Sequence, residues 1–322
     1  MCAVARLMFC VLGLLLVGHD ASAQNYPSKP IRLVVPFPPG GPTDVIARLY
    51  AAKLAEALGQ PVVIDNKAGA SGQIGTQEVA RAAPDGHTLV ANPSSVVIIP
   101  HVYANPLFDV ERDFVAVSLM ASVPAVLIVP ASTNAGTVGE LVAGFKAKGG
   151  RINFGSSSVA GAMHLIGESF AQLNGLDMQH IAYKGGGPAI AAVISGEVPM
   201  SFESLPAAMP QIKSGQLKAL ALSAPKRSPA LPEVPTMIEA GFAGFDFGSW
   251  YGIWAPAKTP PEIVKRLNAE LSKIAGSANM KSRLADLGTD PEARSPDEFA
   301  AFQKIENVRW GGIARKAGIK LD

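Results

Sequence analysis

The stretch IRLVVPFPPGGPTDVIARLYAAKLAEAL, residues 31–58, holds the pattern that decides the fold. It begins with a short apolar run rich in β-branched residues, which predicts a strand over 31–36. A turn of glycine and proline follows, and apolar residues then recur at the spacing of one helical face, at Val45, Ile46, Leu49, Leu54 and Leu58. A strand, a turn and a helix in this order are typical of an α/β protein.

The same alternation continues along the chain. Further short apolar runs predict strands at 62–65, 88–91, 125–129, 152–155, 178–183, 199–202 and 219–223. A second helical stripe covers 263–274. Two motifs, TPPE at 259–262 and SPDE at 295–298, predict helix starts with a hydroxyl N-cap, proline next and glutamate at the third helical position. We therefore expect the α/β fold class over the whole globular part.

The length of 322 residues suits one large domain or two medium ones. No repeat or low-complexity linker divides the chain, but proline-containing segments near 122–124 and 224–235 are candidate crossing points. Two crossings fit an inserted lobe. We therefore expect a first lobe built from 24–123 and 224–322, and a second lobe built from 124–223.

The N-terminus predicts a signal peptide over residues 1–23. Residues 1–6 are short and positively charged, residues 7–17 are apolar, and the sequence Ala-Ser-Ala at 21–23 has the small residues that a signal peptidase needs. We expect cleavage after Ala23 and a periplasmic product. No later apolar run approaches the roughly 18 residues that indicate a membrane span.

The two cysteines of the sequence, Cys2 and Cys10, both lie in this segment. The mature chain therefore has no thiol for a disulfide, a nucleophile or a metal ligand. A lipoprotein anchor on Cys10 is the alternative, but the bulky Met8 and Phe9 before it do not suit a lipobox.

The composition and motifs exclude several functions. Lys and Arg number 28 against 26 Asp and Glu, and no basic run is present, so we expect no nucleic-acid partner. The four later histidines show no metal-binding spacing, and Walker, GxGxxG and GxSxG motifs are missing. The carboxylate pairs Glu111/Asp113 and Asp297/Glu298 suit helix caps or solvated faces. We therefore expect no catalytic residue, no metal and no cofactor.

A strand, a Gly/Ser/Pro turn and a helix start recur together at 35–48, 66–76, 153–165 and 183–190. Any one of these turns can simply connect a strand to a helix. Four of them, however, each leave free N–H groups at a helix N-terminus, and such groups stabilise an anion without a formal positive charge. Open α/β sheets bind ligands at the carboxyl ends of their strands, so the sequence predicts an anion-binding cleft there.

Several long motifs resemble one known family. They include YPSKPIRLVVPFPPGGPTDVIAR from 26, NKAGASGQIG from 66, HLIGESF from 164, YKGGGPAI from 183 and WYGIWAPAKTPPEIVKRLN from 250. The mature chain closely resembles the Bug (TctC) family, the periplasmic substrate-binding proteins of tripartite tricarboxylate transporters. The resemblance implies a two-lobed type II periplasmic-binding (Venus-flytrap) fold with a cleft between the lobes, and a monomer.

The resemblance also implies which residues form the site. It nominates Phe37, Pro39, Gly40, Gly41, Thr43, Asp44, Ala70, Ser71, Gly72, Asn92, Ser94, Ser95, Ser156, Ser157, Ser158, His164, Tyr183, Lys184 and Glu203. Among these, Asp44 suits a helix-start cap better than a ligand contact, because a carboxylate would repel an anionic ligand. His164 on a helical stripe is by default a packed histidine. At Glu203 the sequence departs from the family, since many relatives carry Asp there.

The function that the resemblance implies is solute binding, not catalysis. We therefore expect the protein to capture a small carboxylate, such as a di- or tricarboxylate, an aromatic carboxylate or an acidic amino acid, and to deliver it to the subunits of a membrane permease. The alternatives are a periplasmic sensor subunit that signals to a membrane kinase, and a periplasmic hydrolase.

Overall fold

The computed structural model describes residues 26–321. The predicted signal peptide, its cleavage site and both cysteines lie outside the described residues.

The fold is built on one curled, ten-stranded mixed sheet. At one end β1 (Ile31–Val35) lies between β2 (Val62–Asn66) and β3 (Thr88–Pro93), all parallel. The long β9 (Gly248–Pro256) and β4 (Phe114–Pro130) follow in antiparallel order, and β7 (Ser201–Ser204), β5 (Ile152–Ser156) and β6 (Met178–Ala182) complete the other end. Two further strands, β8 (Leu217–Ser223) and β10 (Asp290–Pro291), pair with β4. The predicted α/β fold class is confirmed.

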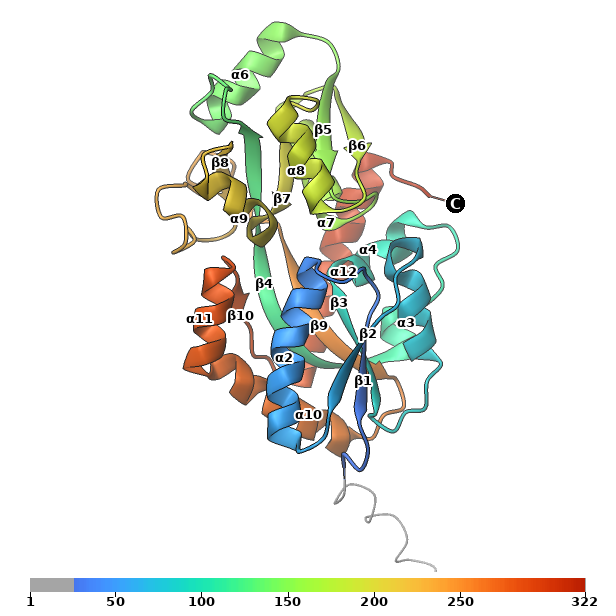
Figure 1. Ribbon diagram of the computed structural model, residues 1–322. Helices are drawn as coiled ribbons and strands as arrows, with labels where there is room; N and C mark the ends of the chain where they lie inside the picture. The colour runs from blue at the N-terminus through green and yellow to red at the C-terminus, as the bar shows by residue number, and fades with distance from the viewer. Residues whose placement is uncertain (1–25, 322) are drawn as a thin grey trace, which may run out of the picture.

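Strand β4 runs through both halves of the molecule (Figure 1). It pairs with β9 from Phe114 to Pro124, and with β7 and β8 from Ala125 onward. The partner therefore changes at the point where the sequence analysis places a crossing, but the residue limits of the two lobes stay a prediction. The sequence indicated only the second half of β4, where the apolar run AVLIV at 125–129 is uninterrupted, and it missed the first half, whose apolar run is broken by Ser118 and Ser122.

Helices cover both ends of the sheet (Figure 1). Around the β1–β3 end lie α2 (Pro42–Leu58), α3 (Gln73–Ala80), α4 (Ser95–Val102), α5 (Val110–Asp113), α10 (Pro261–Gly276) and α11 (Ala278–Asp286), with the 3-10 turn η1 (Ala70–Gly72). Around the β5–β6 end lie α6 (Val138–Lys148), α7 (Ala162–Asn174), α8 (Gly186–Ser195) and α9 (Leu205–Lys213). The last helix, α12 (Pro296–Ala317), packs against α4, β4 and α7, and so contacts elements of both halves.

The two predicted helix starts differ in outcome. At α12 the Ser295 hydroxyl accepts from the Glu298 N–H while the Glu298 carboxylate accepts from the Ser295 N–H, which confirms the capping box. At α10 the prediction was wrong, because the helix begins one residue later with Pro260 as N-cap, and the buried Thr259 hydroxyl has no partner among the described residues.

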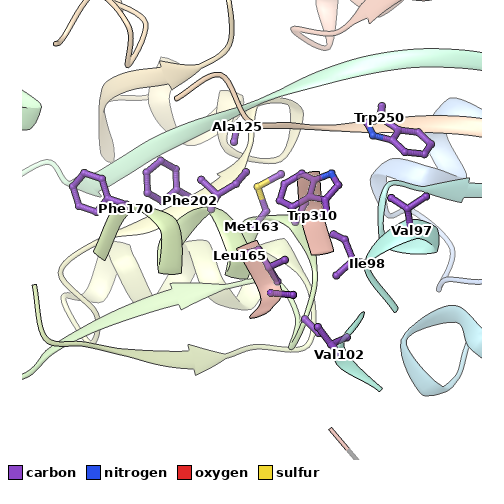
Figure 2. Close-up of a cluster of buried hydrophobic side chains, with 14 of the residues drawn as sticks. Val97, Ile98, Val102, Ala125, Met163, Leu165, Phe170, Phe202, Trp250 and Trp310 are labelled. Atoms are coloured by element: carbon purple, nitrogen blue, oxygen red, sulfur yellow. The ribbon is translucent and has the colours of Figure 1, made fainter. Parts of the chain in front are cut away.

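An apolar cluster joins the two halves where α7 and α12 pack on the sheet (Figure 2). It brings together Phe170 and Phe202 from one half with Trp250 and Trp310, all fully or nearly fully buried. The indole N–H groups of Trp250 and Trp310 both donate to Oε2 of Glu306, at 2.9 Å each. The polar edge of each indole is therefore satisfied inside the core.

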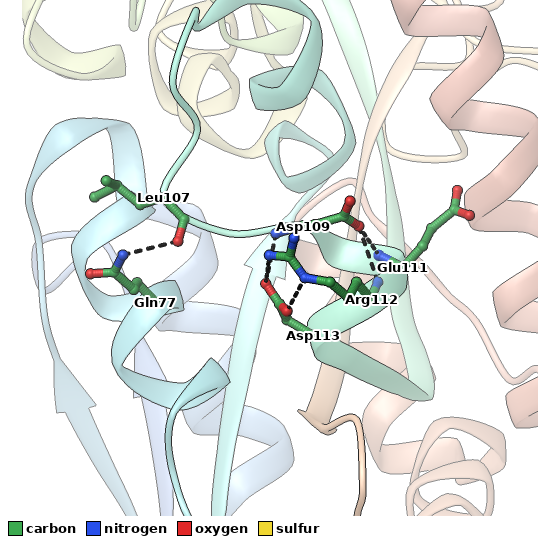
Figure 3. Close-up of polar contacts among 6 residues, drawn as sticks. All are labelled: Gln77, Leu107, Asp109, Glu111, Arg112 and Asp113. Atoms are coloured by element: carbon green, nitrogen blue, oxygen red, sulfur yellow. Dashed lines mark hydrogen bonds and ion pairs between the residues drawn. The ribbon is translucent and has the colours of Figure 1, made fainter.

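The segment that leads into β4 is held by polar contacts (Figure 3). Asp109 caps α5 by accepting from the N–H groups of Glu111 and Arg112, and Arg112 pairs with Asp113 at 2.7 Å. Gln77 donates to the carbonyl of Leu107 at 3.0 Å. The carboxylates at 111 and 113 thus lie in a capped, ion-paired segment.

Candidate functional site

A cleft of about 640 Å³ lies between the two halves, and helix N-termini from both of them line it. The lining residues include Gly41, Pro42 and Thr43 of α2, Ser94 and Ser95 of α4, Gly161, Ala162 and Met163 of α7, Gly185, Gly186 and Gly187 of α8, and Ser204, Pro206 and Ala207 of α9. The first-turn N–H groups of a helix have no partner inside the helix and carry its positive dipole end. Five such ends around one cleft make it an anion-binding environment.

The loop between β1 and α2 forms the first wall. Phe37 is half-buried there, and Gly72 allows its close approach, since a Cβ at Gly72 would come within 2.9 Å of the Phe37 ring. Asp44 is buried beneath this loop and its carboxylate accepts from Gly40 N and Asn66 Nδ2 at 2.9 Å, and from Arg48 at 2.8 Å. Burial alone would raise the pKa of Asp44, but these three hydrogen bonds outweigh it and lower the pKa. Asp44 therefore holds the loop and does not line the cleft.

Hydroxyl groups extend this wall. Ser71 lies 2.9 Å from the hydroxyl of Tyr103, and Ser94 lies 3.2 Å from that of Ser249. The buried hydroxyl of Ser95, which also lines the cleft, has no partner among the described residues. A buried hydroxyl without a protein partner is usually satisfied by an ordered water molecule.

The opposite wall comes from the loop at 157–161, the start of α8 and the end of β7. Among the described lining residues, Lys184 and Glu203 are the two with charged side-chain types, and Lys184 is exposed. Glu203 is 1% exposed, and its Oε1 accepts from Ser201 at 3.2 Å. Burial raises the pKa of Glu203 to about 8, although the Ser201 hydrogen bond opposes this shift.

A polar cluster lies behind this wall. His164 and His180 stack at 3.6 Å between ring centroids, and Nε2 of His180 is 2.7 Å from the Ser156 hydroxyl. Ser156 is fully buried and donates to the carbonyl of Ser158 at 2.9 Å. Burial, together with the neighbouring His164, lowers the pKa of His180 to about 3, so its ring is neutral at physiological pH.

The structure brings twelve of the nineteen nominated residues to the surface of the cleft. They are Phe37, Pro39, Gly40, Gly41, Thr43, Ser71, Ser94, Ser95, Ser157, Ser158, Lys184 and Glu203. Seven others, Asp44, Ala70, Gly72, Asn92, Ser156, His164 and Tyr183, lie around it without lining it. Two of these have clear partners elsewhere, since Asn92 donates to Thr76 at 3.1 Å and Tyr183 donates to Glu197 at 2.8 Å. Direct ligand contact by the twelve stays a prediction.

Sequence reasoning missed other lining residues. Ser204 and Pro206 at the start of α9 line the cleft but were not nominated. A hydroxyl residue followed closely by proline is a typical helix start, so the sequence did contain a signal for this one. Tyr103, Ser249 and Leu287 are others, and they come from segments that carry no binding motif. Within residues 26–321 no group of three or more potential metal ligands occurs, and no helix there is long and apolar enough to cross a membrane.

A comparison with known families shows to which family the chain belongs. Residues 46–319 match the model of the TctC family, described as tripartite tricarboxylate transporter family receptor. The chain belongs to this family. The receptor is also 38% identical over 307 residues to Protein BugT of Bordetella pertussis, which covers 95% of this chain and 94% of BugT.

Solved structures show the same relationship. The receptor is similar to an R. palustris protein solved with adipate, with a TM-score of 0.86, 34% identity and coverage of 92% of this chain and 99% of that one. The periplasmic binding protein BugD has a TM-score of 0.82 and 34% identity, with coverage of 92% of this chain and 99% of BugD. MatC from Rhodopseudomonas palustris with bound malate has a TM-score of 0.79 and 32% identity, with coverage of 90% of this chain and 100% of MatC. The predicted two-lobed periplasmic-binding fold is confirmed, and two of these similar structures hold small carboxylates, adipate and malate.

Proposed function

We propose that this receptor captures a small carboxylate in the periplasm by closing its lobes, and delivers it to a tripartite tricarboxylate-type permease. The convergence of five helix N-termini on one cleft carries the proposal. Only one lysine and no arginine line that cleft among the described residues, so backbone amides and hydroxyls bind the anion. The predicted signal peptide over residues 1–23 supports export to the periplasm.

The binding free energy expected from a few hydrogen bonds to a carboxylate is sufficient for reversible capture. A hydrogen bond to a charged group contributes about 1.5–3 kcal/mol, so three or four of them approach the roughly 8 kcal/mol of a micromolar complex. Ordering of the ligand and of the lobes reduces this sum. The closed form gains because amides from both walls reach the ligand only when the lobes meet.

The lining also indicates the body of the ligand. Apolar side chains, among them Phe37, Ile99, Met163 and Leu287, cover much of the cleft. A carboxylate with an apolar chain or ring between its polar ends suits such walls. Adipate and malate, which the two similar structures hold, are therefore the first probes to use.

The pair formed by Ser156 and His180 has the atom types of a hydrolase nucleophile and base. Ser156 is nevertheless fully buried, does not line the cleft, and donates its hydroxyl proton to Ser158. The pair supports the loop above it, and the geometry favours binding over hydrolysis.

A thermal-shift screen of the mature protein tests the proposal, because a ligand that binds the folded state raises its melting temperature. The panel comprises C4 to C6 di- and tricarboxylates, aromatic acids and acidic amino acids, with adipamide as the uncharged match of adipate. A saturable shift with one acid, without its amide and without turnover, is the expected result. A protein that shows no shift after denaturing extraction and refolding, which removes any retained ligand, would contradict the carboxylate assignment.

A further inference from the structure

The second-lobe loop at 157–161 ends in a backbone conformation that side chains rarely adopt. Ala160 has φ +56° and is 3% exposed, and the residues from Ser157 to Gly161 all line the cleft. A residue other than glycine holds a positive φ only where its surroundings stabilise it, and such residues gather at functional sites. The surroundings of Ala160 therefore need a specific interaction.

His164 supplies that interaction. The N–H of Ala160 donates to Nδ1 of His164 at 3.0 Å, and the side chain of His164 is 7% exposed. Nδ1 is therefore the unprotonated nitrogen, and the ring proton is on Nε2, which lies 3.4 Å from Glu168. His164 is the third residue of α7 and accepts from the residue before the N-cap Gly161, one position further back than the N-cap N–H that a glutamate holds in a capping box.

The first lobe has the same arrangement. Gly40 has φ +81°, the N-cap that follows is Gly41, and Asp44, the third residue of α2, accepts from Gly40 N at 2.9 Å. Both walls of the cleft thus place a residue of positive φ just before a glycine N-cap, and the third residue of the helix holds its N–H. An alanine and a histidine in one lobe take the places of a glycine and an aspartate in the other.

The start of the second-lobe loop is tied to the same imidazole stack. His180 lies against His164 at 16° between ring planes and contacts Ser156, which in turn donates to Ser158. The two rings therefore hold both ends of the loop that faces the ligand.

We propose that His164 is a positioning residue, which holds Ala160 in its positive-φ conformation and so sets the loop at 157–161 in its ligand-binding shape before ligand arrives. His164 itself does not line the cleft. The role in ligand binding rests on the proposed function, whereas the positioning itself is observable in the free protein.

Two substitutions with the same number and branching of side-chain heavy atoms test the positioning. His164→Asn keeps an acceptor near the place of Nδ1, and His164→Leu removes it. We expect hydrogen exchange of the Ala160 amide, measured by NMR without ligand, to speed up at least about tenfold in the leucine variant and to stay within about threefold of wild type in the asparagine variant. Amides in the middle of α7, such as that of Phe170, should not change in either variant.

Two results would overturn the proposal. One is equal exchange at Ala160 in the two variants, and the other is a loss of protection throughout α7 and β5 in the leucine variant, which would mean that the histidine only fills the core. Ala160→Gly in the His164→Leu background separates conformation from packing, because glycine accepts positive φ without help.

Adipate titration then measures the consequence for binding. We expect His164→Leu to weaken adipate binding about tenfold, which corresponds to about 1.4 kcal/mol, and added Ala160→Gly to restore most of the affinity. Unchanged affinity in His164→Leu would refute the role in binding. A wild type that binds none of the acids in the panel would instead count against the proposed function, and the exchange data would still decide the positioning.

Discussion

Replacing Glu203 with glutamine measures what it costs to keep an ionisable carboxyl in the wall of the cleft. Burial raises the pKa of Glu203 from 4.5 to about 8. Between these values the folded state holds a proton that the unfolded chain releases, so this group makes the free energy of unfolding fall as pH rises through that window. The slope of 1.36 kcal/mol per pH unit predicts a loss of about 3 kcal/mol between pH 5 and pH 7.5. The adjacent N-termini of α8 and α9 favour the ionised form by about 0.3–1 kcal/mol each, which leaves about 2 kcal/mol.

Glutamine has the shape of the protonated side chain and cannot ionise. We therefore expect Glu203→Gln and wild type to have similar stability at pH 5, and the variant to be about 2 kcal/mol more stable at pH 7.5. Urea unfolding of the ligand-free proteins at both pH values gives the difference, and the other titrating groups cancel in it. Glu233→Gln, on the exposed loop after β8, is the matched control and should follow wild type. Parallel stability curves for Glu203→Gln and wild type would refute the assignment of a protonated Glu203.

Three other substitutions test separate parts of the structure. Glu306→Leu leaves the indole N–H groups of Trp250 and Trp310 unpaired in the core, so we expect the free energy of unfolding to fall by about 3 kcal/mol in urea titrations. Glu306→Gln keeps an acceptor and should lose less stability. Equal losses in the two variants would contradict this explanation. His180 has its pKa lowered to about 3 by burial and by its histidine neighbour, so the unfolded chain takes up a proton first as pH falls below 6.5. Wild type should therefore lose about 1 kcal/mol from pH 7 to pH 5 relative to His180→Phe, after allowance for partial exposure, and a constant difference would argue against a neutral His180. Gly40→Ala should cost about 1 kcal/mol through its φ of +81° alone, because no atom lies within 4 Å of the added Cβ, and an unchanged melting temperature would show that the loop relaxes.

Helix caps and strand–helix order could be predicted from the sequence because they depend on interactions between residues close together in the chain. The capping box at Ser295 needs only a hydroxyl and a glutamate three residues apart, and it is present in the structure. The strand, turn and helix order of residues 31–58 rests on side-chain periodicity, and β1 and α2 follow it closely. The same reasoning failed at Thr259, where two consecutive prolines moved the helix start by one residue.

The cleft shows where local reasoning stops. Glycine-rich turns and hydroxyls at helix starts indicated an anion site, and the structure gathers most of the nominated residues around one cleft. The sequence did not indicate that Tyr103, Ser249 and Leu287 join them, because these residues come from elements whose patterns encode only burial or pairing.

The sequence by itself therefore determined the α/β alternation, the family and three of the five helix starts that line the cleft, those of α2, α7 and α8. Only the tertiary structure decided that β4 serves both halves, that Glu203 is buried in the cleft wall, and that His164 stacks on His180 beneath the loop. The physical reason is the distance along the chain over which each interaction acts. Periodicity and capping act over a few neighbouring residues, whereas burial of a carboxyl and stacking of two rings depend on how distant segments pack together.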